Sequence, residues 1–396
     1  MKVVPSLIAG LATALSAMWS PLDAQGSVIH ADGAPAWGAN VRLVPAVTVG
    51  VLDGPPEYAF GSVHFVVGEK SGGFFVHDSR YAQIRRYNAS GKLIANIGGK
   101  GAGPGEYQDL LGMALAGDSA LVTWDPRNAR VTFFGLDGKV QSSFRPMLGS
   151  TTYASDVFGI DNAGVVSLQS GIGETRKYVR YRSDGTLLDT IPAAEGTGGA
   201  FVLMTTDGSR FSFETTTLSK PSPSGGLVSA VTSTLGFTMT VAGKGTSVER
   251  AHSPIRLGAE ERKEWIAYAD VVYARAKARP AQPNVRAPEP VLAKIPTVKP
   301  SLRDFFADRE GRVWLDVYTA AEKRNIPPRP SGDTRPQITW RERSTHDVFA
   351  TSGQYLGHIT LPAEHQLLDA RGDWVWTLTH GPDDEDRIVV FHIVRK

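Results

Sequence analysis

The chain contains no cysteine among its 396 residues. Disulfide bridges and metal sites built on thiolates are therefore excluded, although a chain of this length can bury a sufficient core without covalent cross-links. The formal net charge is also small, at +2, so charge of one sign does not dominate the chain. A recognised nucleic-acid-binding motif is absent as well, and we expect no nucleic-acid partner.

Long apolar runs are absent after the first residues. Val3 to Met18 is apolar but too short to span a bilayer of about 30 Å at about 1.5 Å of helix rise per residue. Lys2 precedes this run, and Leu22-Asp-Ala24 follows it as a cleavage site. We therefore expect residues 1–25 to be a secretory signal peptide and residues 26–396 to form a periplasmic or extracellular domain without a membrane span.

Several catalytic signatures are missing too. The histidines show no zinc-binding spacing such as His-Glu-x-x-His, and the serines lie in no Gly-x-Ser-x-Gly motif. The glycine-rich stretch from Gly98 to Gly105 lacks the Gly-Lys-Ser/Thr ending of a phosphate-binding loop. We interpret this stretch as a turn.

What the chain does contain is a repeat with a period of 47 residues. The segment from Asp78 to Lys92 aligns without gaps with the segment from Asp125 to Lys139. Apolar residues alternate between turn residues in each copy, as in Gln83 to Tyr87, which is typical of half-buried antiparallel strands. Four short strands in about 40 to 50 residues indicate one blade of a β-propeller.

Further copies of this pattern predict six blades. They lie near residues 62–97, 109–146, 155–192, 212–251, 302–353 and 366–393, and the fourth is the most degenerate. Three tryptophans in predicted second strands should be wedges between blades, namely Trp124, Trp314 and Trp376.

The chain ends complete the predicted ring. The last blade offers only three strands, and the alternating run from Val41 to Gly50 has no other partner. We therefore predict an all-β, six-bladed propeller that this N-terminal strand closes, because pairing the two ends of the chain removes exposed sheet edges.

Two insertions interrupt the blades. Residues 251–300 join blades 4 and 5, and residues 319–345 join the second and third strands of blade 5. The first insertion contains a predicted helix at about 259 to 278, which Pro280 ends. Its apolar stripe either docks on the rim of the propeller or belongs to a lid or partner helix. Both connections lie on one face, which we call the top face.

The top face carries the candidate binding residues. The two insertions have net charges of +4 and +3, which favours an anionic ligand or partner, although solvated basic loops would have the same charge. The Asp-x-Arg turns and the Gly-Pro-Glu turns fall on the same face. The candidate ligand-binding residues are Glu57, Arg80, Glu106, Arg127, Arg324, Arg329 and Arg335.

Three aspartates begin innermost strands and could line the central channel. Asp109 and Asp156 are one repeat apart, and Asp304 matches them with a shift of one residue. Together they could bind Ca²⁺, which takes about six to eight oxygen ligands. Alternatively, each caps a turn or pairs with an arginine of an Asp-x-Arg turn. The aspartates that begin those turns, Asp78 and Asp125, should accept hydrogen bonds from their own turn amides.

The order of these motifs resembles bacterial six-bladed propellers related to NHL repeats. The resemblance rests on an order along the chain: a strand, an Asp-x-Arg turn, a second strand, a Gly turn, a third strand and then Gly-x-Gly-Pro-Gly-Glu. It covers most of the mature chain. It implies an exported, non-catalytic scaffold that needs no cofactor and binds a ligand, a protein or an acidic polymer through its top face. The wider six-bladed class also implies an alternative, a calcium-dependent hydrolase of lactonase type with its metal at the central channel.

Overall fold

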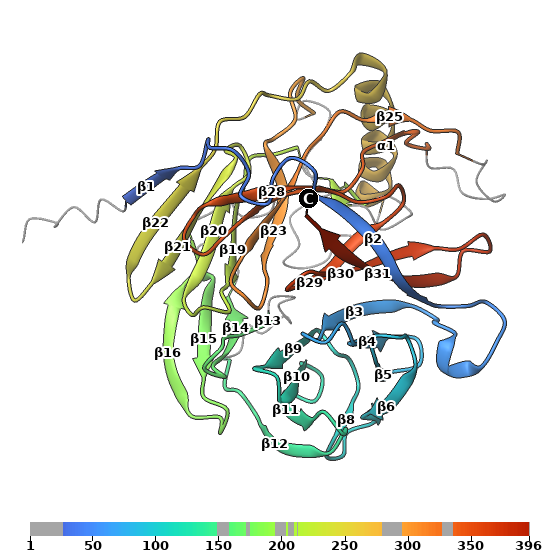
Figure 1. Ribbon diagram of the computed structural model, residues 1–396, viewed down its shortest axis with the longest axis vertical. Helices are drawn as coiled ribbons and strands as arrows, with labels where there is room; N and C mark the ends of the chain where they lie inside the picture. Colours follow the sequence, from blue (N-terminus) through green and yellow to red (C-terminus); the bar gives the residue numbers. More distant parts are fainter. Residues whose placement is uncertain are drawn as a thin grey trace, which may run out of the picture.

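Six antiparallel sheets surround a common centre in the computed structural model, so the chain is an all-β, six-bladed propeller as predicted (Figure 1). The structure describes residues 27–148, 158–171, 175–194, 203–204, 210–211, 213–278, 295–326 and 336–395. Within each blade the strands that come from one continuous segment pair in chain order, and first strands contact one another from blade 6 through blades 1, 2 and 3 to blade 4. The first strands therefore line the channel.

Blades 1 to 3 each contain four strands from one continuous segment. Blade 1 consists of β3 (Val63–Gly68), β4 (Phe74–Asp78), β5 (Gln83–Tyr87) and β6 (Leu93–Ile97). Blade 2 consists of β9 (Gly112–Ala116), β10 (Ala120–Asp125), β11 (Arg130–Gly135) and β12 (Val140–Phe144). Blade 3 consists of β13 (Phe158–Ile160), β14 (Val166–Ser170), β15 (Lys177–Tyr181) and β16 (Leu187–Pro192).

Blades 4 and 5 follow the same plan. Blade 4 contains β19 (Thr217–Pro221), β20 (Leu227–Val231), β21 (Gly236–Val241) and β22 (Lys244–Glu249). Blade 5 contains β23 (Leu302–Ala307), β24 (Val313–Val317), β27 (Thr345–Phe349) and β28 (Tyr355–Thr360). Short elements in the connections are the 3-10 helix η1 (Pro56–Tyr58) and the strands β7 (Gly99–Lys100), β8 (Glu106–Tyr107), β17 (Leu203–Met204) and β18 (Arg210–Phe211).

The N-terminal strand closes the ring, as the sequence predicted. Blade 6 consists of β29 (Gln366–Arg371), β30 (Trp374–His380), β31 (Asp386–Val394) and β2 (Arg42–Val49). β2 pairs antiparallel with β31, from Arg42 opposite Val394 to Val49 opposite Ile388. Because β2 and β31 come from opposite ends of the chain, this pairing joins the first and last blades through backbone hydrogen bonds.

A strand that the sequence did not predict precedes β2. β1 (Ser27–His30) pairs in parallel with β22 and adds a fifth strand to blade 4. The chain then follows the edge of blade 5, where the amides of Ala36 and Trp37 donate to the carbonyls of Tyr355 and Leu356 at 3.1 and 2.8 Å. We call residues 27–49 the N-terminal segment. It covers the outer edges of blades 4, 5 and 6 (Figure 1).

Apolar clusters lie between adjacent blades and contain the predicted tryptophan wedges. Trp124 packs with blade 3, Trp314 with blade 6 and Trp376 with blade 1, and all three are almost fully buried. Gly68 is required by this packing, because a Cβ there would lie 2.2 Å from the Trp376 ring. The wedges therefore set the spacing of the blades.

The predicted helix is α1 (Ala259–Lys277), between blades 4 and 5. Trp265 and Tyr268 are buried against Tyr318 and Ile338 of the second insertion, which also holds the strands β25 (Glu322–Lys323) and β26 (Trp340–Arg341). Glu264 accepts hydrogen bonds from the amide and hydroxyl of Thr339, both at 2.6 Å. The apolar stripe is thus docked in the structure. The predicted stop at residue 280 lies outside the described residues.

Arginines bridge the bottom end of the channel, opposite the top face. Arg371 of blade 6 is 6% exposed and pairs with Asp118 in a turn of blade 2 and, at 3.8 Å, with Glu310 in a turn of blade 5. Arg309 of blade 5 donates to the carbonyl of Ile160 in blade 3 at 2.8 Å. The contacts of Arg371 with Asp118 and of Arg309 with Ile160 join blades that are not neighbours. In the described part of the chain, no helix is long and apolar enough to cross a membrane.

Candidate functional site

The repeated aspartates organise the turns of the top face. Asp78 is fully buried at the end of β4 and accepts hydrogen bonds from the amides of Gly61 at 2.8 Å, Ser62 at 3.2 Å and Arg80 at 3.1 Å. Asp125 makes the equivalent contacts in blade 2, to the amides of Gln108, Arg127 and Asn128. The predicted bonds to turn amides are confirmed, and each carboxylate also holds the connection that enters its blade.

An arginine fastens the glycine-rich turn between blades 1 and 2. Arg130, the first residue of β11, donates from Nη1 to the carbonyl of Gly103 at 2.5 Å and from Nη2 to the carbonyl of Ala102 at 2.6 Å. The Glu106 carboxylate accepts a hydrogen bond from the Gly103 amide at 2.8 Å within the same turn. The two hydrogen bonds from Arg130 hold its guanidinium in one orientation.

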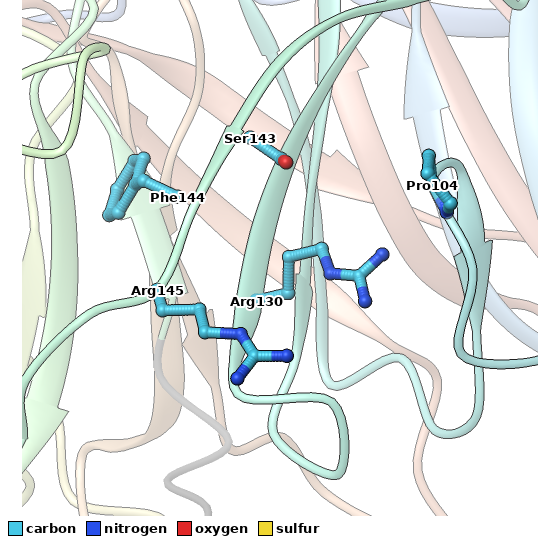
Figure 2. A pocket seen from close by; sticks show the side chains of 5 residues that line it. All are labelled: Pro104, Arg130, Ser143, Phe144 and Arg145. Atoms are coloured by element: carbon cyan, nitrogen blue, oxygen red, sulfur yellow. The ribbon is translucent and has the colours of Figure 1, made fainter.

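A hollow of about 310 Å³ opens beside this turn. We call it the blade-2 pocket, and its lining residues are Pro104, Arg130, Ser143, Phe144 and Arg145. Pro104 comes from the glycine-rich turn, and Arg145 directly follows β12. Figure 2 shows the Ser143 hydroxyl and both guanidinium groups turned toward the side on which Pro104 lies. Phe144 points the other way, and its ring packs against Tyr181 with centroids 5.5 Å apart.

The blade-2 pocket is electrostatically unbalanced. Arg145 is exposed, and within the described ranges of the chain it forms no ion pair. Arg130 has only backbone carbonyls as its partners in the same ranges. Two guanidinium groups thus face one hollow, and its described lining residues include no carboxylate, which favours an anion between them.

The predicted ligand-binding residues lie at several separate places on the molecule. Arg127 is in the next turn of blade 2, with its side chain 68% exposed, and Arg80 is exposed in the matching turn of blade 1. Glu57 lies in η1, where its carbonyl accepts a hydrogen bond from Tyr87. Arg324 pairs with Glu322 at 3.3 Å in the second insertion. The remaining two, Arg329 and Arg335, are outside the described residues.

The aspartates proposed for a metal pair with cations instead. Asp109 lies 3.6 Å from Arg127, and Asp304 lies 2.7 Å from the Nζ of Lys220 in blade 4. Asp156 is outside the described residues. Among the residues that the structure does describe, no three His, Asp or Glu side chains gather as a metal site would require. The arrangement of Asp109 and Asp304 therefore does not fit the oxygen cage of Ca²⁺.

Charges under α1 are paired and buried. The side chain of Lys299 is fully buried between Glu261 of α1 at 2.7 Å and Glu342 at 2.8 Å. Burial raises the pKa of Glu261, and the contact with Lys299 opposes that rise. Arg303 contacts Glu342 at 2.9 Å and Asp316 at 2.8 Å, where burial raises the pKa of Asp316 to about 6. This network holds the helix in place and has no free cation for a ligand.

The pocket arginines were not among the residues selected from the sequence. A departure from the repeat could have identified them, since Arg130, Ser143 and Arg145 take the positions of Gln83, Asn96 and Gly98 in blade 1. The uncharged residues of blade 1 are compatible with the same strands and turns. The blade-2 residues are therefore not required by the repeat, which is the signal expected of a binding site on a regular scaffold.

No protein-family model matches the chain, and no curated protein matches it. Among solved structures it is similar to a candidate exported protein of Bacteroides fragilis, with 10% identity, a TM-score of 0.49 and coverage of 93% of this chain and 99% of the other. It is also similar to a member of the DUF4221 family from Bacteroides vulgatus, with 11% identity, a TM-score of 0.47 and coverage of 90% and 99%.

A third similar structure is a gluconolactonase of Xanthomonas campestris, with 12% identity, a TM-score of 0.37 and coverage of 84% of this chain and 86% of the other. Sequence identities of this size carry no activity from these proteins to the chain. The strand pairing places the chain in the class of six-bladed β-propellers, and its function has to be argued from its own residues.

Proposed function

We propose that the protein is an exported binding module that holds an anionic ligand or partner in the blade-2 pocket of its top face. The observation that carries this proposal is the pair Arg130 and Arg145, whose guanidinium groups face one hollow of about 310 Å³ without a carboxylate between them. Ligand pockets begin at about 300 Å³, so the hollow accommodates a small molecule or one unit of a polymer.

The two arginines have complementary roles in this proposal. Arg130 is held by the carbonyls of Ala102 and Gly103, so an anion can bind it with little loss of side-chain freedom. Arg145 is exposed and can adjust to the ligand. A held guanidinium and an adjustable one together favour an anion whose remaining part extends into solvent.

The same residues favour binding over catalysis. The polar side chains that line the blade-2 pocket are two arginines and the serine Ser143. Arginine stays protonated in proteins, so it cannot accept a proton from a reacting group. A basic patch of this kind instead attracts anions and strengthens their binding. Export of the protein rests on the apolar run that follows Lys2, in the expected signal peptide.

Three dextran polymers with the same backbone test the proposal. We expect dextran sulfate or carboxymethyl-dextran to bind in 50 mM salt and neutral dextran not to bind. Binding should weaken strongly by 500 mM salt, because screening shortens to about 4 Å near that ionic strength. Biolayer interferometry on the full mature chain would measure the affinities.

A pair of variants separates the pocket from general surface charge. Arg145→Ser removes a pocket arginine, whereas Lys139→Ser removes a lysine of the same blade whose side chain is 86% exposed. We expect the first variant to lose about tenfold in affinity and the second to lose about twofold at most, since exposed ion pairs contribute little. Equal losses in both variants, or equal binding of neutral dextran, would contradict the proposal.

A further inference from the structure

The donor atoms of the blade-2 pocket are too numerous and too widely directed for a carboxylate. Arginine has five N–H donors, and Arg130 gives one from Nη1 and one from Nη2 to backbone carbonyls. Three donors of Arg130 therefore remain, among them Nε–H. Among the described residues Arg145 has no hydrogen-bond partner, so all five of its donors remain, and the Ser143 hydroxyl adds one more.

The geometry of these donors distinguishes a carboxylate from a phosphate or sulfate ester. The end of the Arg130 guanidinium that carries Nη1 and Nη2 binds the carbonyls, so its free fork is the edge formed by Nε and Nη2. A second fork comes from Arg145, and Ser143 contributes from the preceding strand, β12. Donors from three separate side chains approach the hollow from different directions.

A carboxylate has two oxygens in one plane with about four acceptor positions, which two arginine forks already occupy. A phosphate or sulfate group attached through an ester has three terminal oxygens that point in three directions. The two guanidinium forks and the Ser143 hydroxyl therefore match the three terminal oxygens of such an ester better than the two oxygens of a carboxylate. The hollow of about 310 Å³ also leaves space for the group that carries the oxyanion.

We infer that the blade-2 pocket selects a tetrahedral oxyanion carried as an ester, a phosphate monoester or a sulfate monoester, over a carboxylate. This inference rests on the proposed function of the same pocket and specifies the class of its ligand. Phosphate and sulfate esters share the three terminal oxygens, and the charge of the group distinguishes them, since a phosphate monoester carries close to two negative charges at neutral pH.

Four ligands with the same sugar ring test the inference on the full mature chain. They are glucose 6-phosphate, glucose 6-sulfate, glucuronate and glucose, measured by isothermal titration calorimetry at one ionic strength. We expect one or both esters to bind at least about tenfold more tightly than glucuronate, because each good charged contact contributes strongly when donors and acceptors match in number. Glucose should give no signal.

Variants locate the binding. Ser143→Ala should weaken the ester complexes about threefold to tenfold and leave glucuronate unchanged, because only the third oxygen needs the hydroxyl. Arg145→Gln should weaken the binding of every anion, and Lys139→Gln, at an exposed cation of the same blade, should change none of the affinities. A preference for phosphate over sulfate would identify the doubly charged ester as the ligand type, and the reverse preference would identify the sulfate.

Two outcomes overturn the inference in different ways. If glucuronate binds as tightly as the esters and Arg145→Gln abolishes its binding, the pocket is an anion site without tetrahedral selectivity, and the proposed function stands alone. If none of the four ligands binds while the anionic dextrans do so independently of Arg145, both the inference and the proposed use of the pocket are wrong.

Discussion

His77 is a buried histidine whose Nδ1 atom has no hydrogen-bond partner in the part of the chain that the structure describes. It lies in β4 directly before the turn aspartate Asp78, 3% exposed, with its ring 6.0 Å from Phe65 and 5.8 Å from Tyr107 between centroids. Burial and, to a smaller extent, the nearby His64 together lower the pKa of His77 to about 4. The folded protein therefore keeps this ring neutral over a range in which the unfolded chain protonates it.

The predicted consequence is acid-dependent stability. Because the pKa of His77 is about 4 when folded and 6.5 ordinarily, its contribution is present above pH 6.5 and is lost as pH falls toward 4. The loss should reach about 3 kcal/mol, at 1.36 kcal/mol per unit of pKa difference. Urea unfolding from pH 7.5 to 4.5 would measure it.

A matched pair of variants isolates this contribution. His77→Phe keeps an aromatic ring between Phe65 and Tyr107 but cannot be protonated, so its stability should depend less on pH than that of the wild type. His30→Phe changes an exposed histidine of β1 and should follow the wild-type curve. If the free energies of unfolding of the wild type and of His77→Phe changed in parallel with pH, His77 would not titrate in this range.

β2 contributes to the fold as an element, because it completes blade 6. Val49 is 4% exposed and belongs to the apolar cluster between blades 6 and 1, whereas Val44 of the same strand is 37% exposed. The strand combines backbone pairing to β31 with one side chain inserted between two blades. Its loss would expose the edge of β31 to other chains.

A charge at the buried position should break this closure. Val49→Asp places an unpaired carboxylate in an apolar cluster, which should lower the free energy of unfolding by about 3 kcal/mol or more. Val44→Asp should change it by less than about 1 kcal/mol, since surface substitutions have small effects. Urea unfolding followed by circular dichroism gives both values, and gel filtration would report association through the freed edge. Equal stability of the two variants would refute the closing role of β2.

Across the whole molecule, Arg371 and its two acidic partners join turns of blades 6, 2 and 5 below the channel. The arginine side chain is 7% exposed, whereas Asp118 is 64% exposed, so Arg371 is the buried member of this group. Asp369 lies at the same end of the channel, and burial raises its pKa to about 7 while Arg371 lowers it. Through Asp118, the ring therefore has a polar connection between blades 6 and 2, which are not neighbours.

Loss of this connection should weaken the ring as a whole. Arg371→Met should lower the free energy of unfolding by about 1 to 2 kcal/mol, because the buried guanidinium loses its contacts with Asp118 and Glu310, and the buried Asp369 loses a favourable charge nearby. Arg127→Met removes an arginine from the exposed pair with Asp109 and should cost less than about 1 kcal/mol. Chemical denaturation of both variants at one pH compares them. A loss in Arg371→Met no larger than in Arg127→Met would mean that the blades are held by apolar packing alone.

The amino-acid sequence by itself determined the repeating parts of this protein. Strand alternation and the 47-residue period predicted the blades, and the unpaired run from Val41 to Gly50 predicted the closing strand. These features are local, because a blade requires apolar residues at alternate positions and turn residues at fixed intervals. The helix was predictable for the same reason, since its apolar residues recur at helical spacing.

Only the tertiary structure decided the features that depend on distant neighbours. β1 is four residues long and mostly exposed, so no burial pattern marks it, and its partner β22 follows more than two hundred residues later. The blade-2 pocket combines a turn, the start of one strand and the end of another. Its arginines face one hollow because the packing of Pro104, Arg130 and Arg145 leaves space between them, and sequence spacing does not encode the space that side chains leave unfilled.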